Sequence, residues 1–218
     1  MNDHSPPTVP FADLGKADKR AALLRAATEV FAEVGYANAT IKRIAARAGT
    51  ADGTLYNHFA NKEALLLGVA DGLRQRHDAA LASVDFDALA PEDGVRAVVA
   101  AVAASTSSAL PELKVVVSQA LVDAAFATRL KADLLAPMRQ AAAQAFALMA
   151  PKPVDDVDID LALRLAAAPA LGLLAMRLVG DDDIEARWAE YLQHAARACE
   201  TLLQQHMTTL SSSTGTPS

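Results

Sequence analysis

The chain has 218 residues, of which 52% are hydrophobic and 5% aromatic, and it contains one cysteine. This length fits one large domain or two small ones, and the apolar fraction is enough for a buried core. The formal net charge of −6 excludes a protein that is cationic over its whole surface, and a lone Cys199 excludes an intrachain disulfide.

The N-terminal segment, residues 1–14, is predicted to be a flexible arm because it holds three prolines. It has no apolar stretch of the kind found in signal peptides. The longest uncharged run, residues 97–111, is too short to cross a bilayer, which needs about 20 apolar residues. We therefore expect a cytoplasmic protein without membrane contact.

Two helices are expected next. The first begins near Lys16, carries apolar residues at helical spacing and ends at Gly35. Its apolar positions are Leu23, Ala27, Val30, Phe31 and Val34. The second is short, is capped by Thr40 or Asn38 and ends at Gly49. Its narrow apolar stripe consists of Ile41, Ile44, Ala45 and Ala48.

A polar segment, "GTADGTLYNHFA", separates this short helix from a long one expected over residues 62–84, with Asn61 as its N-cap. Leu55 and Phe59 are the clear core anchors of the segment. Its polar and aromatic side chains are expected to face outward: Thr54, Tyr56, Asn57 and His58. Short helices with a glycine-containing turn between the second and third describe a helix-turn-helix.

Residues 20–66 carry a set of residues in fixed spacing, beginning with "FAEVGY". The set continues with Ile44-Ala45, Ala48-Gly49, Gly53, Leu55-Tyr56, His58-Phe59, Lys62-Glu63 and Leu65. In this register the segment resembles the DNA-binding domain of the TetR family of transcriptional repressors. The resemblance implies an all-α fold, with a three-helix DNA-binding domain at residues 15–62 and a larger helical ligand-binding and dimerisation domain at residues 63–207.

The resemblance also implies which residues contact double-stranded operator DNA. Tyr56 and His58 would reach phosphates or base edges, Gly53 and Thr54 would lie against the duplex, and Lys62 would bind a phosphate from the first turn of the next helix. The full expected set is Thr40, Lys42, Arg43, Thr50, Asp52, Gly53, Thr54, Tyr56, Asn57, His58 and Lys62.

Two positions before Gly53 depart from the family's usual pattern. Ala51 and Asp52 stand where a small hydroxyl residue and a basic or polar residue are common. Asp52 would repel phosphate, and it would instead cap the recognition helix or accept from a cytosine amine. Arg43 replaces an acid common before "IA" and returns positive charge nearby.

Helices separated by short turns are expected in the rest of the chain, with starts at Pro91 and Pro111 and a break at Pro137. A disordered tail is expected over residues 208–218. Large apolar side chains in an Ala-rich body are either ordinary core or the wall of a pocket for an apolar or aromatic inducer. These candidates are Phe126, Met138, Phe146, Met149 and Met176.

The first of the two final helices, about residues 160–180, is apolar on more than one face, and the last, about residues 183–207, continues an apolar stripe with charged residues outside it. They either complete a monomer core or form the interface of a homodimer. The candidate interface residues are Ala167, Ala170, Leu171, Leu174, Leu178, Trp188, Tyr191 and Ala195.

No catalytic grouping, phosphate loop or metal-ligand spacing stands out, so we expect no enzyme activity, no cofactor and no metal. The resemblance favours a ligand-responsive regulator, most simply a repressor that binds a near-palindromic operator as a homodimer. The alternative is a dimeric helical sensor or interaction module with reduced or lost DNA binding.

Overall fold

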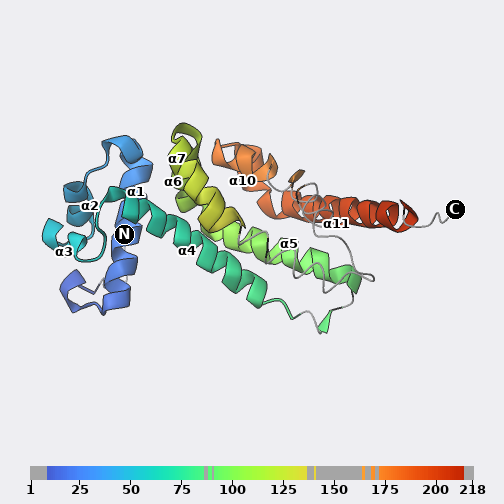
Figure 1. The fold of residues 1–218 in the computed structure, drawn as a ribbon, viewed down its shortest axis with the longest axis horizontal. Helices are drawn as coiled ribbons and strands as arrows, with labels where there is room; N and C mark the ends of the chain where they lie inside the picture. The colour runs from blue at the N-terminus through green and yellow to red at the C-terminus, as the bar shows by residue number, and fades with distance from the viewer. Residues whose placement is uncertain are drawn as a thin grey trace, which may run out of the picture. The chain divides into compact units, whose positions relative to one another are not determined.

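The computed structural model describes residues 9–85, 88–89, 91–136, 140, 164, 168–169 and 172–213. Within these residues every regular element is a helix, which confirms the all-α prediction (Figure 1). The elements are η1 (Phe11–Asp13), α1 (Lys16–Asn38), α2 (Ile41–Arg47), α3 (Asp52–Tyr56), α4 (Lys62–Ala82), α5 (Pro91–Ser108), α6 (Leu110–Val122), α7 (Ala124–Leu130), the π-helix η3 (Lys131–Leu135), α10 (Asp182–Ala186) and α11 (Trp188–Ser213). Residues 172–178 are also helical.

The chain divides into two compact units. The first consists of Met1–Leu73 and Pro111–Leu130, and the second of Arg74–Leu110 and Lys131–Ser218. This division differs from the expected boundaries at residues 15–62 and 63–207. The assignment of the first range to DNA binding and of the second to ligand binding and dimerisation stays a prediction.

In the first unit, α1 buries the apolar stripe expected from its spacing, and Leu23, Ala27 and Val30 are fully covered. Gly35 does not end α1, but it interrupts the regular helix with φ 75° and ψ 157°. A left-handed backbone is accessible to glycine at little cost, whereas a Cβ would strain it. A further turn follows Gly35 and continues to Asn38.

Local signals set the bounds of α2 and the start of α4. The Thr40 hydroxyl accepts a hydrogen bond from the Arg43 amide at 3.2 Å, which is the N-cap contact expected for α2. Gly49, at φ 71°, turns the chain after α2. The Asn61 carboxamide accepts from the Ala64 amide at 2.8 Å, so Asn61 caps α4 as predicted.

The run expected to form one helix from Pro111 is split at Asp123 into α6 and α7. The Asp123 carboxylate accepts from the amides of Ala125 and Phe126, both at 3.0 Å. These bonds lower the pKa of Asp123, with the Phe126 amide as the main cause. Asp123 therefore starts a new helix where apolar periodicity alone suggested a continuous one.

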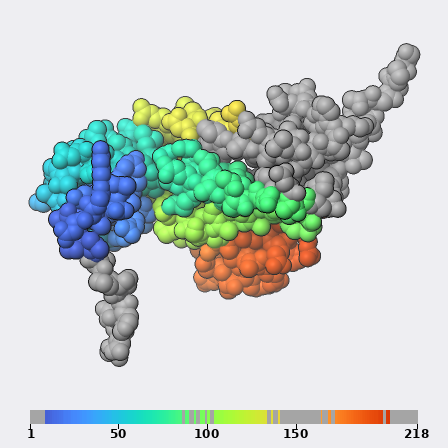
Figure 2. Space-filling view, turned by 90° about the horizontal axis from the view of Figure 1, so that it is seen from below, coloured from blue at the N-terminus to red at the C-terminus, as the bar shows by residue number. Residues whose placement is uncertain are grey.

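In the second unit, α5 packs against α11, and α10 packs against α11. Figure 2 shows the orange surface of α10 and the beginning of α11 against the green surface of α5. The Trp188 indole donates to the Ser107 hydroxyl across this contact. Asp181 caps α10 by accepting from the Ile184 amide at 3.0 Å, and a non-helical Arg187 separates α10 from α11.

Both ends of the described chain are more ordered than expected. Phe11 in η1 is buried, so the expected flexible arm is folded from there onward. Helix α11 continues to Ser213, which makes residues 208–213 helical rather than disordered. No glycine or proline interrupts this stretch before Gly215, and Ser and Thr cost a helix only a few tenths of a kcal/mol, about 0.5 each. Among the described helices, none is long and apolar enough to span a bilayer.

Candidate nucleic-acid interface

Helix α3 and the residues that follow it bury one apolar edge and leave the rest of their surface exposed or half-buried. Leu55 and Phe59 are buried, as predicted. Between them Tyr56 is 54% exposed, an unusual degree for an aromatic side chain, and Asn57 is exposed as well. Thr54 and His58 are half-buried. The helix therefore exposes the phenol ring of Tyr56 and, at its end, the amide of Asn57.

The first turn of α3 resolves one of the two alternatives for Asp52. The N-cap position belongs to Ala51, which makes no side-chain cap hydrogen bond, and Asp52 is the first helical residue. Asp52 therefore does not cap α3, although an acid in the first turn is favoured by the helix dipole. Its exposed carboxylate still stands beside Gly53, where a Cβ would meet no atom within 4 Å.

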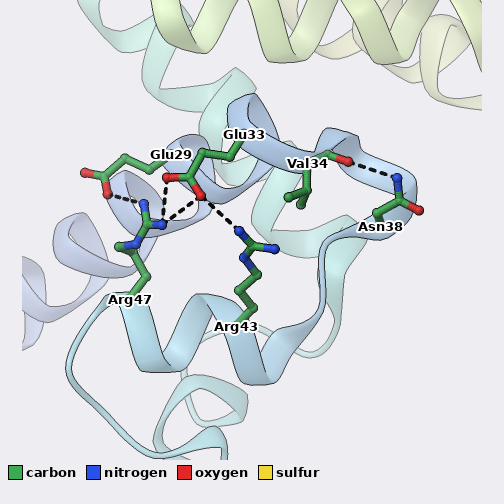
Figure 3. Close-up of polar contacts among 6 residues, drawn as sticks. All are labelled: Glu29, Glu33, Val34, Asn38, Arg43 and Arg47. Carbon is green, nitrogen blue, oxygen red and sulfur yellow. Dashed lines mark hydrogen bonds and ion pairs between the residues drawn. The ribbon is translucent and has the colours of Figure 1, made fainter.

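Helix α2 carries three cations, two of which are paired with acids on α1. Arg43 Nη2 lies 3.1 Å from Glu33 Oε2. Arg47 donates through Nη1 to Glu29 at 3.0 Å and through Nη2 to Glu33 at 2.8 Å. Figure 3 shows both guanidinium groups pointing from α2 to the two carboxylates on α1.

These ion pairs change the charges that α2 presents. The hydrogen bond from Arg47 is the main cause of a lowered pKa at Glu33, and the bond to Glu29 is the main cause of a raised pKa at Arg47. All four side chains are partly or largely exposed, so the pairs contribute little to stability but neutralise local charge. The positive charge expected from Arg43 is thus directed to α1.

Sequence reasoning did not find the role of Glu29 and Glu33. The two acids are spaced by one helical turn, on the side of α1 opposite its apolar stripe. That spacing is a usable signal, because Arg43 and Arg47 on α2 have the same spacing. The remaining polar residues expected at the interface, Lys42 and Thr50, are exposed and half-buried respectively.

Lys62 has a different environment from the one expected. Its Nζ lies 2.7 Å from the carbonyl oxygen of Tyr36, 3.1 Å from that of Ala37 and 3.0 Å from that of Ala39. It also lies 4.5 Å from the centroid of the Tyr36 ring. The ammonium group therefore binds the end of α1 in this structure.

The structure describes some of the residues expected to line a pocket or a dimer interface. Phe126 is buried in the first unit, and Met176 is 49% exposed in the second. Leu174, Leu178, Trp188 and Tyr191 are half-buried, whereas Ala195 is only 3% exposed and is covered within one chain. The other expected residues lie outside the described residues: Met138, Phe146, Met149, Ala167, Ala170 and Leu171.

Two of the expected interface residues make contacts within the chain. The Arg177 guanidinium lies over the Trp188 ring, 4.5 Å from its centroid, and is held there by Glu185 at 2.5 and 2.9 Å. The Tyr191 hydroxyl donates to Asp183 at 2.5 Å. Within the residues that the structure describes, no three His, Cys, Asp or Glu side chains lie together in a way that could hold a metal ion.

The first unit matches known proteins by sequence. Residues 23–69 match the family model described as bacterial regulatory proteins, tetR family. The fatty acid metabolism regulator protein of Bacillus subtilis is 44% identical over 54 residues, which are 25% of this chain and 28% of that protein. An HTH-type transcriptional repressor of Mycobacterium tuberculosis is 42% identical over 59 residues, which are 27% of this chain and 31% of that one.

The chain thus matches less than a third of the length of these relatives. Over a larger span the fold is similar to solved structures. One from Mesorhizobium loti, assigned to the TetR family of transcriptional regulators, has a TM-score of 0.63 at 20% identity and covers 88% of this chain and 98% of its own. Residues 23–69 thus carry the helix-turn-helix of the TetR family of bacterial regulatory proteins, and the chain shares the fold of the solved structure over most of its length.

Proposed function

We propose that the chain is a transcriptional regulator that binds double-stranded DNA through α2 and α3. The observation that carries the proposal is the exposed surface of α3, where Tyr56 and Asn57 project from a helix anchored by Leu55 and Phe59. This segment lies inside the region matched by the family model. Tyr56 and His58 would contact phosphates or base edges, with Thr40, Lys42, Thr50, Gly53 and Thr54 beside them.

The test is binding to duplex DNA from the region upstream of the chain's own gene, measured by fluorescence anisotropy. If the Tyr56 hydroxyl binds a phosphate, Tyr56→Phe should weaken binding to upstream and random duplexes alike. His77→Leu, a change on α4 in the second unit, serves as the control and should leave DNA affinity unchanged. Wild-type protein that binds neither duplex would reject the proposal.

The family resemblance further supports a homodimer that acts as a repressor in the cytoplasm. Two copies would place their α3 helices about one DNA turn apart, ~34–36 Å, on a near-palindromic operator. Repression would be relieved by a small apolar or aromatic molecule bound in the helical body. The match to a family of DNA-binding regulators also supports the expectation that the chain is not an enzyme.

One observation favours a second candidate function. Arg43 is paired with Glu33 and Lys62 is bound to the end of α1, so two residues of the expected DNA-contact set are engaged within the protein. The neighbouring cation Arg47 is paired with acids as well. Asp52 adds a negative charge in the first turn of α3. A dimeric sensor or interaction module with reduced DNA binding would have these features. A salt titration distinguishes the two, because a regulator that binds many phosphates loses affinity steeply as salt increases.

A further inference from the structure

Lys62 has all its hydrogen-bonding capacity used inside the protein. A lysine ammonium group has three donors and no acceptor. Here the three nearest acceptors are the carbonyl oxygens of Tyr36, Ala37 and Ala39, at 2.7, 3.1 and 3.0 Å from Nζ. The Tyr36 ring lies on the cation as well, at 4.5 Å from its centroid. A phosphate would have to displace at least one of these contacts.

The three carbonyls belong to the end of α1 and the residue that follows it. The last four carbonyls of a helix lack partners within the helix, and they form the negative end of its dipole. The break at Gly35 leaves a short final turn, in which the Ala39 amide bonds back to the carbonyls of Gly35 and Tyr36 at 3.2 and 3.3 Å. A cation supplied from elsewhere in the fold is therefore favourable at this end.

The same contact explains why a lysine begins α4. A cation in the first turn of a helix is opposed by the dipole of its own helix. Lys62 is in the first turn of α4, but its charge lies at the opposite, negative end of α1. The unfavourable interaction with α4 is thus offset by contacts to residues 23 to 26 positions earlier in the sequence.

The contact of Lys62 links the residues just before the helix-turn-helix to the residue just after it. Ala39 leads directly into Thr40, which caps α2. After α2 and α3 the chain returns through Asn61, which caps α4, to Lys62. One ammonium group therefore joins the segment that enters the helix-turn-helix to the segment that leaves it.

We propose that Lys62 is a positioning residue, which fixes the turn between α1 and α2 to the start of α4 and does not bind phosphate. The proposal rests on the proposed DNA-binding function for its effect on affinity. Without the contact, the turn at residues 36–40 loses three hydrogen bonds to the start of α4, and α2, which follows that turn, is held less firmly to the rest of the unit. DNA binding then weakens because fewer molecules have α2 and α3 in the binding arrangement.

The proposal predicts an uncommon combination of effects for Lys62→Met. Affinity for upstream and random duplexes should fall by about tenfold, while the slope of log K against log salt stays at the wild-type value. Amides of α2 should exchange with solvent faster in the free protein, because the local opening is easier. Lys62→Gln, whose amide keeps two donors without the charge, should recover part of the protection and is the variant to use if Lys62→Met does not fold.

Lys42→Met is the matched control, since Lys42 is an exposed lysine on the same unit. It should leave amide exchange unchanged. If Lys62→Met instead makes the salt slope shallower by about one unit with wild-type amide exchange, Lys62 binds a phosphate and the proposal is wrong. Amide exchange tests the positioning role even if the wild-type protein binds no DNA, an outcome that would reject the proposed function alone.

Discussion

Glu33 on α1 accepts a hydrogen bond from Arg47 on α2, with 2.8 Å between Oε2 and Nη2. Arg43 reaches the same carboxylate from one helical turn earlier, and Arg47 also reaches Glu29. The two arginines of α2 therefore share two acids within the unit. This pairing fixes the orientation of both guanidinium groups and limits the positive potential that α2 can present to phosphates.

Removing the charge of Glu33 should strengthen nonspecific DNA binding. In Glu33→Gln, Arg43 loses its ionic partner, whereas Arg47 keeps Glu29. One cation is thus released, and the slope of log K against log salt for a random duplex should become steeper by about one unit. Asp13→Asn, which removes an exposed acid of η1, controls for the change in net charge. Equal slopes for Glu33→Gln and the wild type would show that Arg43 is too far from the DNA to matter.

Gly53→Ala should separate stability from DNA binding. Gly53 is inside α3, its φ is not in the left-handed region, and a Cβ would meet nothing within 4 Å. Alanine should therefore raise the free energy of unfolding, by up to about 1 kcal/mol. DNA affinity should nevertheless fall, because a methyl group keeps the backbone away from the duplex. Thermal melting and anisotropy on the same samples measure both effects.

Gly49→Ala is the comparison for that experiment. Gly49 has φ 71°, so a Cβ there is strained even though nothing lies within 4 Å of it. The free energy of unfolding should fall by about 1–2 kcal/mol. A Gly53 variant destabilised to the same extent would mean that its loss of DNA affinity reports folding rather than contact.

His77 on α4 should make stability depend on pH. It is 7% exposed, and its Nε2 has no hydrogen-bond partner. Burial lowers the pKa of His77 from 6.5, and attraction to Asp78 opposes the shift in part. The unfolded chain therefore binds the proton more readily, and the free energy of unfolding should fall as the pH drops through about 6.5.

The measurement is chemical denaturation between about pH 8 and pH 5, in the wild type and in His77→Leu. Over this pH range the free energy of unfolding should fall less in His77→Leu than in the wild type, because the variant has no imidazole to protonate. An NMR titration of the His77 ring gives the pKa directly. A value at or above that of an unfolded histidine would contradict the prediction, as would parallel pH profiles for the two proteins.

The helix-turn-helix could be predicted because its boundaries depend on short-range chemistry. Thr40 caps the helix that begins one residue later. Gly49 turns the chain through its own left-handed backbone, and Asn61 caps the helix that begins with the next residue. The contacts of Lys62 could not be read in this way, because they join residues more than 20 positions apart. The split at Asp123 was missed for another reason: the apolar spacing continues through it, and its amide contacts compete with that pattern.

The ion pairs of α2 could be predicted only in part from the sequence. The acids and the arginines each show a one-turn spacing in the sequence, but only the packing of α1 on α2 brings Glu33 to Arg47. Likewise, periodicity alone assigned Ala195 to the candidate dimer interface. In the structure Ala195 is 3% exposed within one chain, and its helix packs against α5.

The proposed dimer makes its sharpest prediction at side chains that one chain leaves uncovered. Met176 is 49% exposed on the helical residues 172–178, and Val179, 85% exposed, follows directly. If a second copy covers them, Met176→Glu combined with Val179→Glu places two carboxylates in an apolar contact. An unpaired buried charge costs several kcal/mol, on the order of 3. The dissociation constant of the dimer should then rise by about 100-fold or more.

Sedimentation velocity at micromolar concentration measures that change. The double variant should sediment as a folded monomer and lose affinity for a palindromic operator, since each copy then binds one half-site alone. Leu121→Glu, which charges an exposed apolar residue of α6 in the first unit, should leave the mass unchanged. If both proteins have the mass of the wild type, Met176 and Val179 face solvent in the assembly. A wild type that is already monomeric would reject the homodimer, and with it the expectation of a palindromic operator.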